Sequence, residues 1–271
     1  MTDLNNFTTQ KELFDFLLNN KSKLIAEKCY NVKKADAISY YVPVYDEKEV
    51  SSKQQLSVDE LLKRDKITAK LVINTTNLMD SHSDVHMKGI WNKSIKEQKE
   101  ILLVQEHEIK FTHIISDKVK ASVKTYDWND LGFNLKGTTE ALVFNAEIEK
   151  QRNSFMFDQY VKGYVKQHSV GMRYVKLELC VNSDDYPKEK ENWDKYITEV
   201  ANKNVAEQKG YFWAVTEAKI VEGSAVPLGS NYATPTLEMK GVEPSDDTQK
   251  HIEDSRSYDT IRQALKEVLT N

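Results

Sequence analysis

Runs of alternating apolar and polar residues between about residues 67 and 232 constrain the fold of this chain more than any other feature. They are rich in Val, Ile, Thr, Tyr and Phe at a period near two, which is typical of β-strands with one buried face. The runs are KITAKLVINTT, HEIKFTHIISDKVKASVKTYDW, GFNLKGTTEALVF, GYVKQHSVGMRYVKLELCV and YFWAVTEAKIVEGSAV. This series predicts an antiparallel sheet or barrel as the core of the chain.

Helical segments interrupt and precede these strands. Residues 154–165 and 189–209 form two insertions between strand runs, and the second carries apolar residues on roughly one helical face. Residues 8–28 have the same amphipathic spacing, with Thr8 or Thr9 placed to cap the helix. The expected class is therefore α+β with a β core.

The pattern divides the chain into three parts. Residues 1–65 are expected to form a helical and extended appendage, in which Ser57 and Glu60 make the capping-box pattern of a short helix. Residues 66–236 carry the strands and form the main domain. Residues 237–271 begin with polar sequence punctuated by Pro and Gly, which predicts a linker, and end in an amphipathic pattern that predicts a terminal helix.

Composition argues against several classes of function. The formal net charge of -4 disfavours a nucleic-acid partner, because phosphate backbones bind clustered Lys and Arg. We find no secretion-signal pattern and no apolar run near the length of a membrane span, so we expect no membrane partner. Cys29 and Cys180 lack metal-ligand spacing, which is typical of a protein kept in a reducing compartment such as the cytosol.

Ser169 stands inside a strand run, in the segment KQHSVGMRY, and is either a structural residue or a nucleophile held by the sheet. A nucleophilic serine needs a base within hydrogen-bond reach and a third group that orients the base. His168 is adjacent, but neighbouring side chains of a strand point to opposite faces. His107 ends an apolar run and enters a strand, which makes it the best-placed base.

A metal site is an alternative centre of chemistry. His82 and His86 have H-x3-H spacing within the polar segment MDSHSDVHMKG. Together with a carboxylate such as Asp80 or Asp84 they would define a metal-dependent hydrolase. The sequence offers no clear third protein ligand, so we expect no metal and no cofactor.

Three stretches together resemble the tailed-phage prohead proteases of the HK97 type, which are serine proteases of capsid maturation. In LMDSHSDVHMKGIWNKSIKEQKEILLVQEHE, a loop containing Asp and Gly leads to a short helix and an apolar run ending in His107. HSVGM contains Ser169, and IVEGSAVPLGSNYATP contains Glu222. The resemblance covers about residues 67–236. The chain departs from the family pattern at Ile90, Trp91, Ser230 and Pro235.

The resemblance implies a fold and a set of roles. The fold would be like that of herpesvirus assemblin, a mostly antiparallel closed β-barrel surrounded by helices. Ser169 would attack the scissile carbonyl, His107 would take up and return the proton, and Glu222 would orient the imidazole. Related viral proteases have a histidine in the third place, so a Ser/His dyad is also open. Backbone N–H groups, with residues 229–231 as candidates, would stabilise the oxyanion, and Gly171 would let the substrate or a neighbouring loop approach the strand closely.

The implied function is that of a serine endopeptidase that cleaves scaffold and coat-protein termini during phage procapsid maturation. Its partners would be the major capsid protein and the scaffold, with a homodimer left open, and it would act in the host cytoplasm inside the assembling procapsid. The N-terminal helix and residues 237–271 would be tethers or regions of self-cleavage. The alternative is a catalytically inactive protease-fold scaffold or assembly protein of the capsid, in which Ser169 and His107 point to different faces.

Overall fold

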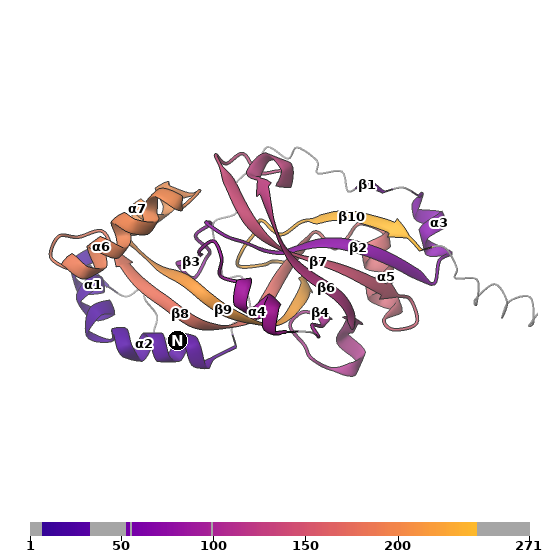
Figure 1. Ribbon diagram of the computed structural model, residues 1–271, viewed down its shortest axis with the longest axis horizontal. Coiled ribbons are helices and arrows are strands. Elements are labelled where there is room, and N and C mark those ends of the chain that lie inside the picture. Colours follow the sequence, from indigo (N-terminus) through magenta and orange to yellow (C-terminus); the bar gives the residue numbers. More distant parts are fainter. Residues whose placement is uncertain (1–6, 33–52, 55, 99, 243–271) are drawn as a thin grey trace, which may run out of the picture.

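The protein, seen here in a computed structural model, is an α+β fold of two β-sheets with helices grouped at both ends (Figure 1). The structure describes residues 7–32, 53–54, 56–98 and 100–242. The strands are β1 (Lys53–Gln54), β2 (Lys66–Thr75), β3 (Asp84–His86), β4 (Leu103–Gln105), β5 (Ile114–Ser116), β6 (Lys118–Asp127), β7 (Thr138–Glu149), β8 (Gln167–Val181), β9 (Tyr211–Val226) and β10 (Thr236–Gly241).

The helices are short, and none among the described residues is long and apolar enough to cross a membrane. The α-helices are α1 (Gln10–Asn19), α2 (Lys21–Tyr30), α3 (Val58–Leu62), α4 (Asn92–Glu97), α5 (Ser154–Val161), α6 (Pro187–Tyr196) and α7 (Lys203–Lys209). The 3-10 turns are η2 (Phe111–His113), η3 (Trp128–Leu131) and η4 (Ile197–Glu199).

The first sheet has the strand order β1-β10-β2-β7-β6. Its neighbours pair antiparallel, except that the short β1 runs parallel to β10. The alternation expected from the sequence is clear in β2, where Ile67, Ala69 and Leu71 are buried and Lys66 and Thr68 are exposed. The buried side chains face the second sheet, and the exposed ones form a solvated outer surface.

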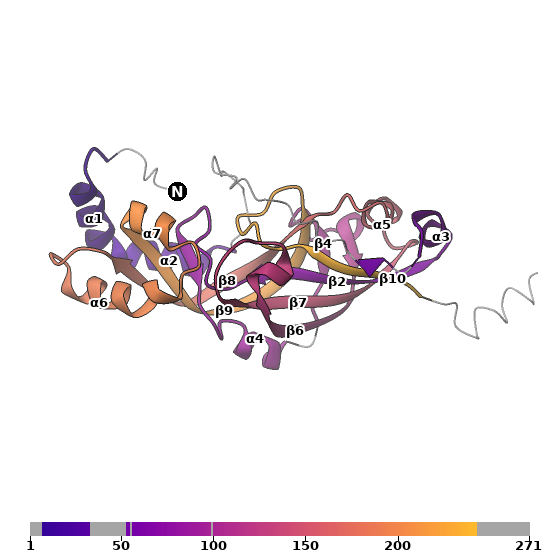
Figure 2. The ribbon, with the colours of Figure 1, turned by 90° about the horizontal axis from the view of Figure 1, so that it is seen from above.

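The second sheet is built around β9. β3 and β4 pair parallel to β9, β5 extends the sheet from β4, and β8 pairs antiparallel with β9 along its whole length. The ribbon of β8 and β9 continues beyond the first sheet, and α1, α2, α6 and α7 gather around its far end (Figures 1 and 2). Helices α3 and α5 lie at the opposite end of the molecule.

The two sheets pack through their apolar faces. Gly223 of β9 lies directly against Phe144 of β7, because a Cβ atom on Gly223 would be 2.4 Å from Phe144 Cε2. Phe144 is fully buried. Since side chains alternate along a strand, Glu222 and Ser224 point to the other face of β9, away from the first sheet.

The closed barrel implied by the resemblance is wrong, whereas the coarser α+β class is confirmed. In the described part of the chain the strands form two separate sheets, and β9 has the parallel neighbours β3 and β4. Alternation reports only that one face of each strand is buried. Two sheets packed face to face satisfy that condition as well as a barrel does, so the pattern could not distinguish them.

The terminal segments differ in part from expectation. The helix predicted over 8–28 is divided at Asn20 into α1 and α2. The capping box of Ser57 and Glu60 is confirmed at the start of α3. Residues 236–241 form β10 beside β2 and are not the start of a linker. Residues 33–52 of the predicted appendage and the terminal helix predicted at the end of 237–271 lie outside the described residues.

A buried ion pair fastens α2 to the second sheet. Lys28 Nζ lies 2.7 Å from Asp84 Oδ1, and the Asp84 side chain is fully buried while that of Lys28 is 23% exposed. The Tyr174 hydroxyl donates to Asp84 Oδ2 at 2.8 Å. Burial, reinforced by the charge of Asp84, raises the pKa of Tyr174 well above its usual value, so the phenol remains a donor. Helix α2 therefore supplies a positive charge that the buried Asp84 of the second sheet needs.

Replacing Lys28 by Met should lower the free energy of unfolding by on the order of 3 kcal/mol, because it removes the ammonium group 2.7 Å from the buried Asp84 carboxylate. Lys11→Met is the matched control, since Lys11 lies 3.7 Å from Asp185 and both side chains are exposed. Its loss should leave stability nearly unchanged. Urea unfolding of both variants checks this, and equal effects would contradict a special role for Lys28.

Candidate active site

The pairing of β8 with β9 brings four small or polar residues to one face of the second sheet. Ser169 pairs with Ser224, and Gly171 pairs with Glu222. Paired residues of antiparallel strands point to the same side of the sheet. This face is the one turned away from the first sheet, because the intervening Gly223 packs on Phe144 of that sheet.

His107 reaches the same face from the turn that follows β4. The Glu106 N–H donates to the Ala225 carbonyl at 3.0 Å, and the His107 N–H donates to Ser224 Oγ at 3.0 Å. Glu106 and His107 have φ angles of 52° and 59°, a left-handed conformation that is uncommon for residues with a side chain. Such strain persists only where surrounding contacts fix it. Here it turns the imidazole back over β9.

The carboxylate of Glu222 binds this imidazole. Glu222 Oε1 lies 2.6 Å from His107 Nδ1, and the two side chains are only 3% and 5% exposed. The Ser224 hydroxyl donates to Glu222 Oε2 at 2.7 Å. Because a carboxylate accepts hydrogen bonds, the neutral imidazole carries its proton on Nδ1, and Nε2 becomes the nitrogen that can accept one. This arrangement suits a general base.

Gly171 makes room for the pair. A Cβ atom at this position would lie 2.0 Å from Glu222 Oε1, so any side chain here would displace the carboxylate. The sequence predicted that the substrate or a neighbouring loop would approach the strand at Gly171, whereas the group that lies there is the Glu222 side chain of the paired strand β9. Ser224 belongs to the stretch that carries the resemblance, but its supporting role was missed. Its spacing of two residues from Glu222 on one strand was the available signal.

Ser169 is 7% exposed and lies two residues before Gly171, on the face that carries Glu222 and His107. Ser169 also contributes to the wall of a cavity of about 10 Å³ between the two sheets, with Asn74 of β2 and with Val170 and Met172, which point to the other face of β8. This volume holds about one water molecule. The structure thus brings the three residues predicted from the sequence to a single face of the sheet.

The loop of residues 229–231, the expected source of oxyanion donors, lies beside the start of β8. Its Gly229 N–H donates to Gln167 Oε1 at 2.9 Å. The Asn231 side chain accepts from the Thr75 hydroxyl at 3.0 Å and donates to the Thr75 carbonyl at 2.8 Å. These bonds anchor the loop between β8 and β2. Its role at an oxyanion stays a prediction.

His168 has a structural environment on the opposite face from Ser169. Its Nδ1 donates to the Thr234 carbonyl at 3.0 Å, and its Nε2 lies 3.1 Å from the Tyr160 hydroxyl. Burial lowers the pKa of His168 to about 4, although the backbone hydrogen bond to Thr234 acts in the other direction. The neighbouring histidine is therefore a neutral core residue.

His82 and His86 are engaged separately. His86 accepts from the Asn74 side chain at 2.9 Å and lies 3.1 Å from the Tyr174 hydroxyl, which also binds Asp84. The His82 N–H donates to Asp80 Oδ1 at 2.8 Å. Among the described residues, no group of three His, Cys, Asp or Glu side chains is arranged to hold a metal ion. The metal-dependent alternative has no ligand set in that part of the chain.

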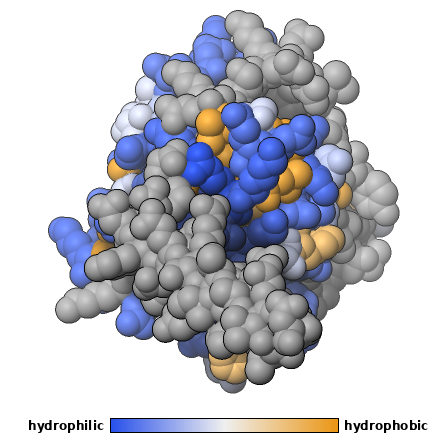
Figure 3. Space-filling model, turned by 90° about the vertical axis from the view of Figure 1, so that its right-hand side faces the viewer, coloured by the Kyte–Doolittle hydropathy of each residue, from blue (hydrophilic) through white to orange (hydrophobic). Residues whose placement is uncertain are grey.

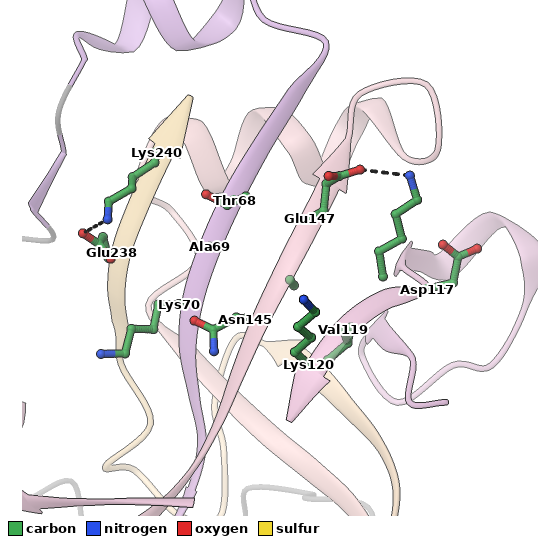
Figure 4. A pocket seen from close by; sticks show the side chains of 12 residues that line it. Thr68, Ala69, Lys70, Asp117, Val119, Lys120, Asn145, Glu147, Glu238 and Lys240 are labelled. Atoms are coloured by element: carbon green, nitrogen blue, oxygen red, sulfur yellow. Dashed lines mark hydrogen bonds and ion pairs between the residues drawn. The ribbon is translucent and has the colours of Figure 1, made fainter. Parts of the chain in front are cut away.

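A larger concavity of about 500 Å³ lies on the outer face of the first sheet, away from Ser169 (Figure 4). Its wall carries lysine and glutamate side chains of β10, β2, β7 and β6. Lys118 lies 2.9 Å from Glu147, and Lys240 lies 2.7 Å from Glu238. Because these charges neutralise one another on an open surface, we interpret the concavity as a solvated sheet face.

None of the protein-family models, curated proteins and solved structures compared with the chain matches it. The resemblance to prohead proteases thus depends on its three short motifs. The geometry of the site is therefore the main evidence on the function of this chain.

Replacing Gly171 by Ala should slow the reaction of Ser169 with a fluorophosphonate by on the order of 100-fold, because the new methyl group displaces Glu222 from His107. Gly223→Ala is the matched control on the same strand pair. It strains the packing on Phe144, on the opposite face, at a similar cost of about 1–3 kcal/mol in stability. Labelling rates per folded molecule, followed by intact mass, separate the two effects. Similar rates for both variants would contradict the positioning role of Gly171.

The buried His168 should make stability depend on pH. The unfolded chain binds a proton at this residue near pH 6.5, while the folded protein does so only near pH 4, so acid favours unfolding between these values. Between pH 7 and about pH 5 the wild type should lose about 2 kcal/mol more than His168→Gln. Urea unfolding at both pH values measures the difference. Parallel losses would show that His168 is not buried in its neutral form.

Proposed function

We propose that the chain is a serine endopeptidase, with Ser169 as nucleophile, His107 as general base and Glu222 as the group that orients the imidazole. The observation that carries the proposal is the buried His107–Glu222 hydrogen bond on the sheet face that also bears Ser169. Burying a carboxylate is unfavourable unless it is well paired.

The proposed reaction begins with attack of Ser169 Oγ on the scissile carbonyl carbon, as His107 Nε2 accepts the hydroxyl proton. The new C–O bond moves the carbonyl π electrons onto oxygen, and Glu222 stabilises the imidazolium. When the C–N bond breaks, the leaving amine takes the proton from His107. Water then attacks the acyl carbon as His107 accepts its proton. The bond to Ser169 Oγ breaks, His107 returns the proton to that oxygen, and the new carboxylic acid leaves.

The 2.6 Å contact supports a triad over a Ser/His dyad, because Glu222 fixes the imidazole tautomer directly. The inactive-scaffold alternative expects Ser169 and His107 on different faces. Strand register favours one common face, which supports the enzyme.

For the biological substrate we propose scaffold and coat-protein termini, cleaved in the host cytoplasm inside an assembling procapsid. The order of the three motifs that resemble prohead proteases supports this choice, and a homodimer stays open. Because Lys28 of α2 neutralises the buried Asp84, loss of the N-terminal helices would destabilise the fold. We therefore place self-cleavage after β10.

Co-expression with the cognate coat protein tests the function. The intact chain should produce truncated coat protein, whereas Ser169→Ala and His107→Ala should lose on the order of 10⁴-fold or more in rate. Glu222→Gln should retain more activity than either, since the orienting acid usually contributes less. Coat-protein termini are read by mass spectrometry. Identical fragments from the wild type and Ser169→Ala would overturn the assignment.

Reaction with diisopropyl fluorophosphate distinguishes a catalytically inactive protein from an active one that was tested on the wrong substrate. The Ser169 oxygen should bond to phosphorus as fluoride leaves, giving one adduct by intact mass. Ser169→Ala should give none, and His107→Ala should react far more slowly. An unlabelled wild type together with uncleaved coat protein would favour the inactive scaffold.

A further inference from the structure

Exposed apolar side chains gather in the loops that flank the candidate site. Eight large hydrophobic residues are exposed in the described part of the chain. Tyr30 lies in α2 and Val175 in β8, whereas Val58 lies in α3, which contacts α5. The others form what we term the apolar rim, which consists of Ile109, Phe111, Phe155, Tyr164 and Leu228.

The rim residues come from segments next to each part of the site. Ile109 and Phe111 follow His107 in the turn after β4, and Phe111 is 86% exposed. Tyr164 precedes β8, and Leu228 follows β9. Phe155 lies in the first turn of α5. At the end of the molecule that carries α5, hydrophobic residues stand between hydrophilic ones (Figure 3).

Hydrogen bonds hold these segments in place. The Asn153 side chain, which caps α5, donates to the Thr112 carbonyl at 3.3 Å. The Gly229 N–H donates to Gln167 Oε1 at 2.9 Å, which ties the Leu228 loop to β8. The Thr236 hydroxyl donates to the carbonyl of Val165, the neighbour of Tyr164, at 3.0 Å. The rim therefore presents its apolar groups at set positions around the ends of β8 and β9.

The charged residues of the same segments balance one another. Within 106–112, 154–166 and 227–232 these residues are Glu106, Glu108, Lys110, Asp158, Lys162 and Lys166. Lys110 lies 2.9 Å from Glu108, and Lys162 lies 3.7 Å from Asp158. A surface with paired charges and fixed apolar groups attracts uncharged, apolar ligands more than acidic or basic ones.

We propose that the apolar rim binds apolar side chains of an extended polypeptide on both sides of the bond presented to Ser169. The inference rests on the proposed function, because it takes a polypeptide as the occupant of this face. Because the rim segments adjoin His107, the start of β8 and the end of β9, we expect the residues that flank a bond presented to Ser169 to meet the rim. The substrate class is then a polypeptide segment with apolar, uncharged residues around the cleaved bond.

Selection from a pool of random ten-residue peptides tests the rim without requiring catalysis. Immobilised Ser169→Ala protein should enrich peptides containing Leu, Ile, Val, Phe or Met at least several-fold, as read by mass spectrometry. Adding Phe111→Ser, Tyr164→Ser and Leu228→Ser should abolish the enrichment. The matched control adds Tyr30→Ser and Val175→Ser and should retain it. Circular dichroism confirms that both variants are folded.

The outcomes distinguish this inference from the proposed function. No enrichment, or equal enrichment by the rim and control variants, overturns the inference whatever the activity of the protein. Enrichment that depends on the rim, with no fluorophosphonate labelling of Ser169, supports apolar peptide binding and rejects the protease. If the rim variant instead loses a dimer seen by sedimentation and no peptide is enriched, the rim is a contact between copies and the inference fails.

Discussion

The hydrogen bond between the His107 imidazole and the Glu222 carboxylate is the interaction on which the candidate site depends. A carboxylate this deeply buried needs donors, and it has two, the His107 Nδ1–H and the Ser224 hydroxyl. The pair also needs space, which only a glycine at position 171 leaves on the neighbouring strand. The left-handed turn at His107 completes the arrangement by directing the ring over β9.

The fold supplies this geometry by placing β9 between β4 and β8. The parallel strand β4 delivers His107 from one edge of β9, and the antiparallel strand β8 delivers Ser169 from the other. The apolar packing of Gly223 on Phe144 determines which face of β9 is buried against the first sheet. Because side chains alternate, that packing also determines that Glu222 and Ser224 face the site. The apolar packing on one face of β9 thus determines where the polar side chains of the candidate site lie on its other face.

The sequence predicts the positions of strands and helices better than it predicts which strands pair. The last strand run was predicted over the same residues as β9, since it is rich in aromatic and β-branched residues and Gly210 ends the preceding helix. β10 was missed because it lies near the sheet edge and only Met239 is buried, so its pattern looks like a polar linker. The barrel was wrong because alternation does not encode which strands pair. Likewise the Lys28–Asp84 pair and the fit of Gly171 to Glu222 depend on contacts between distant segments, which one sequence does not reveal.

The tautomer of His107 shows whether the Glu222 carboxylate orients the imidazole. Long-range ¹H–¹⁵N NMR of protein labelled at histidine, recorded where the imidazole is neutral, identifies which ring nitrogen carries the proton. If Glu222 orients the ring, the wild type has a protonated Nδ1 and an unprotonated Nε2, and this preference is lost in Glu222→Ala. A neutral His107 protonated at Nε2, or a spectrum unchanged by the loss of Glu222, would contradict it.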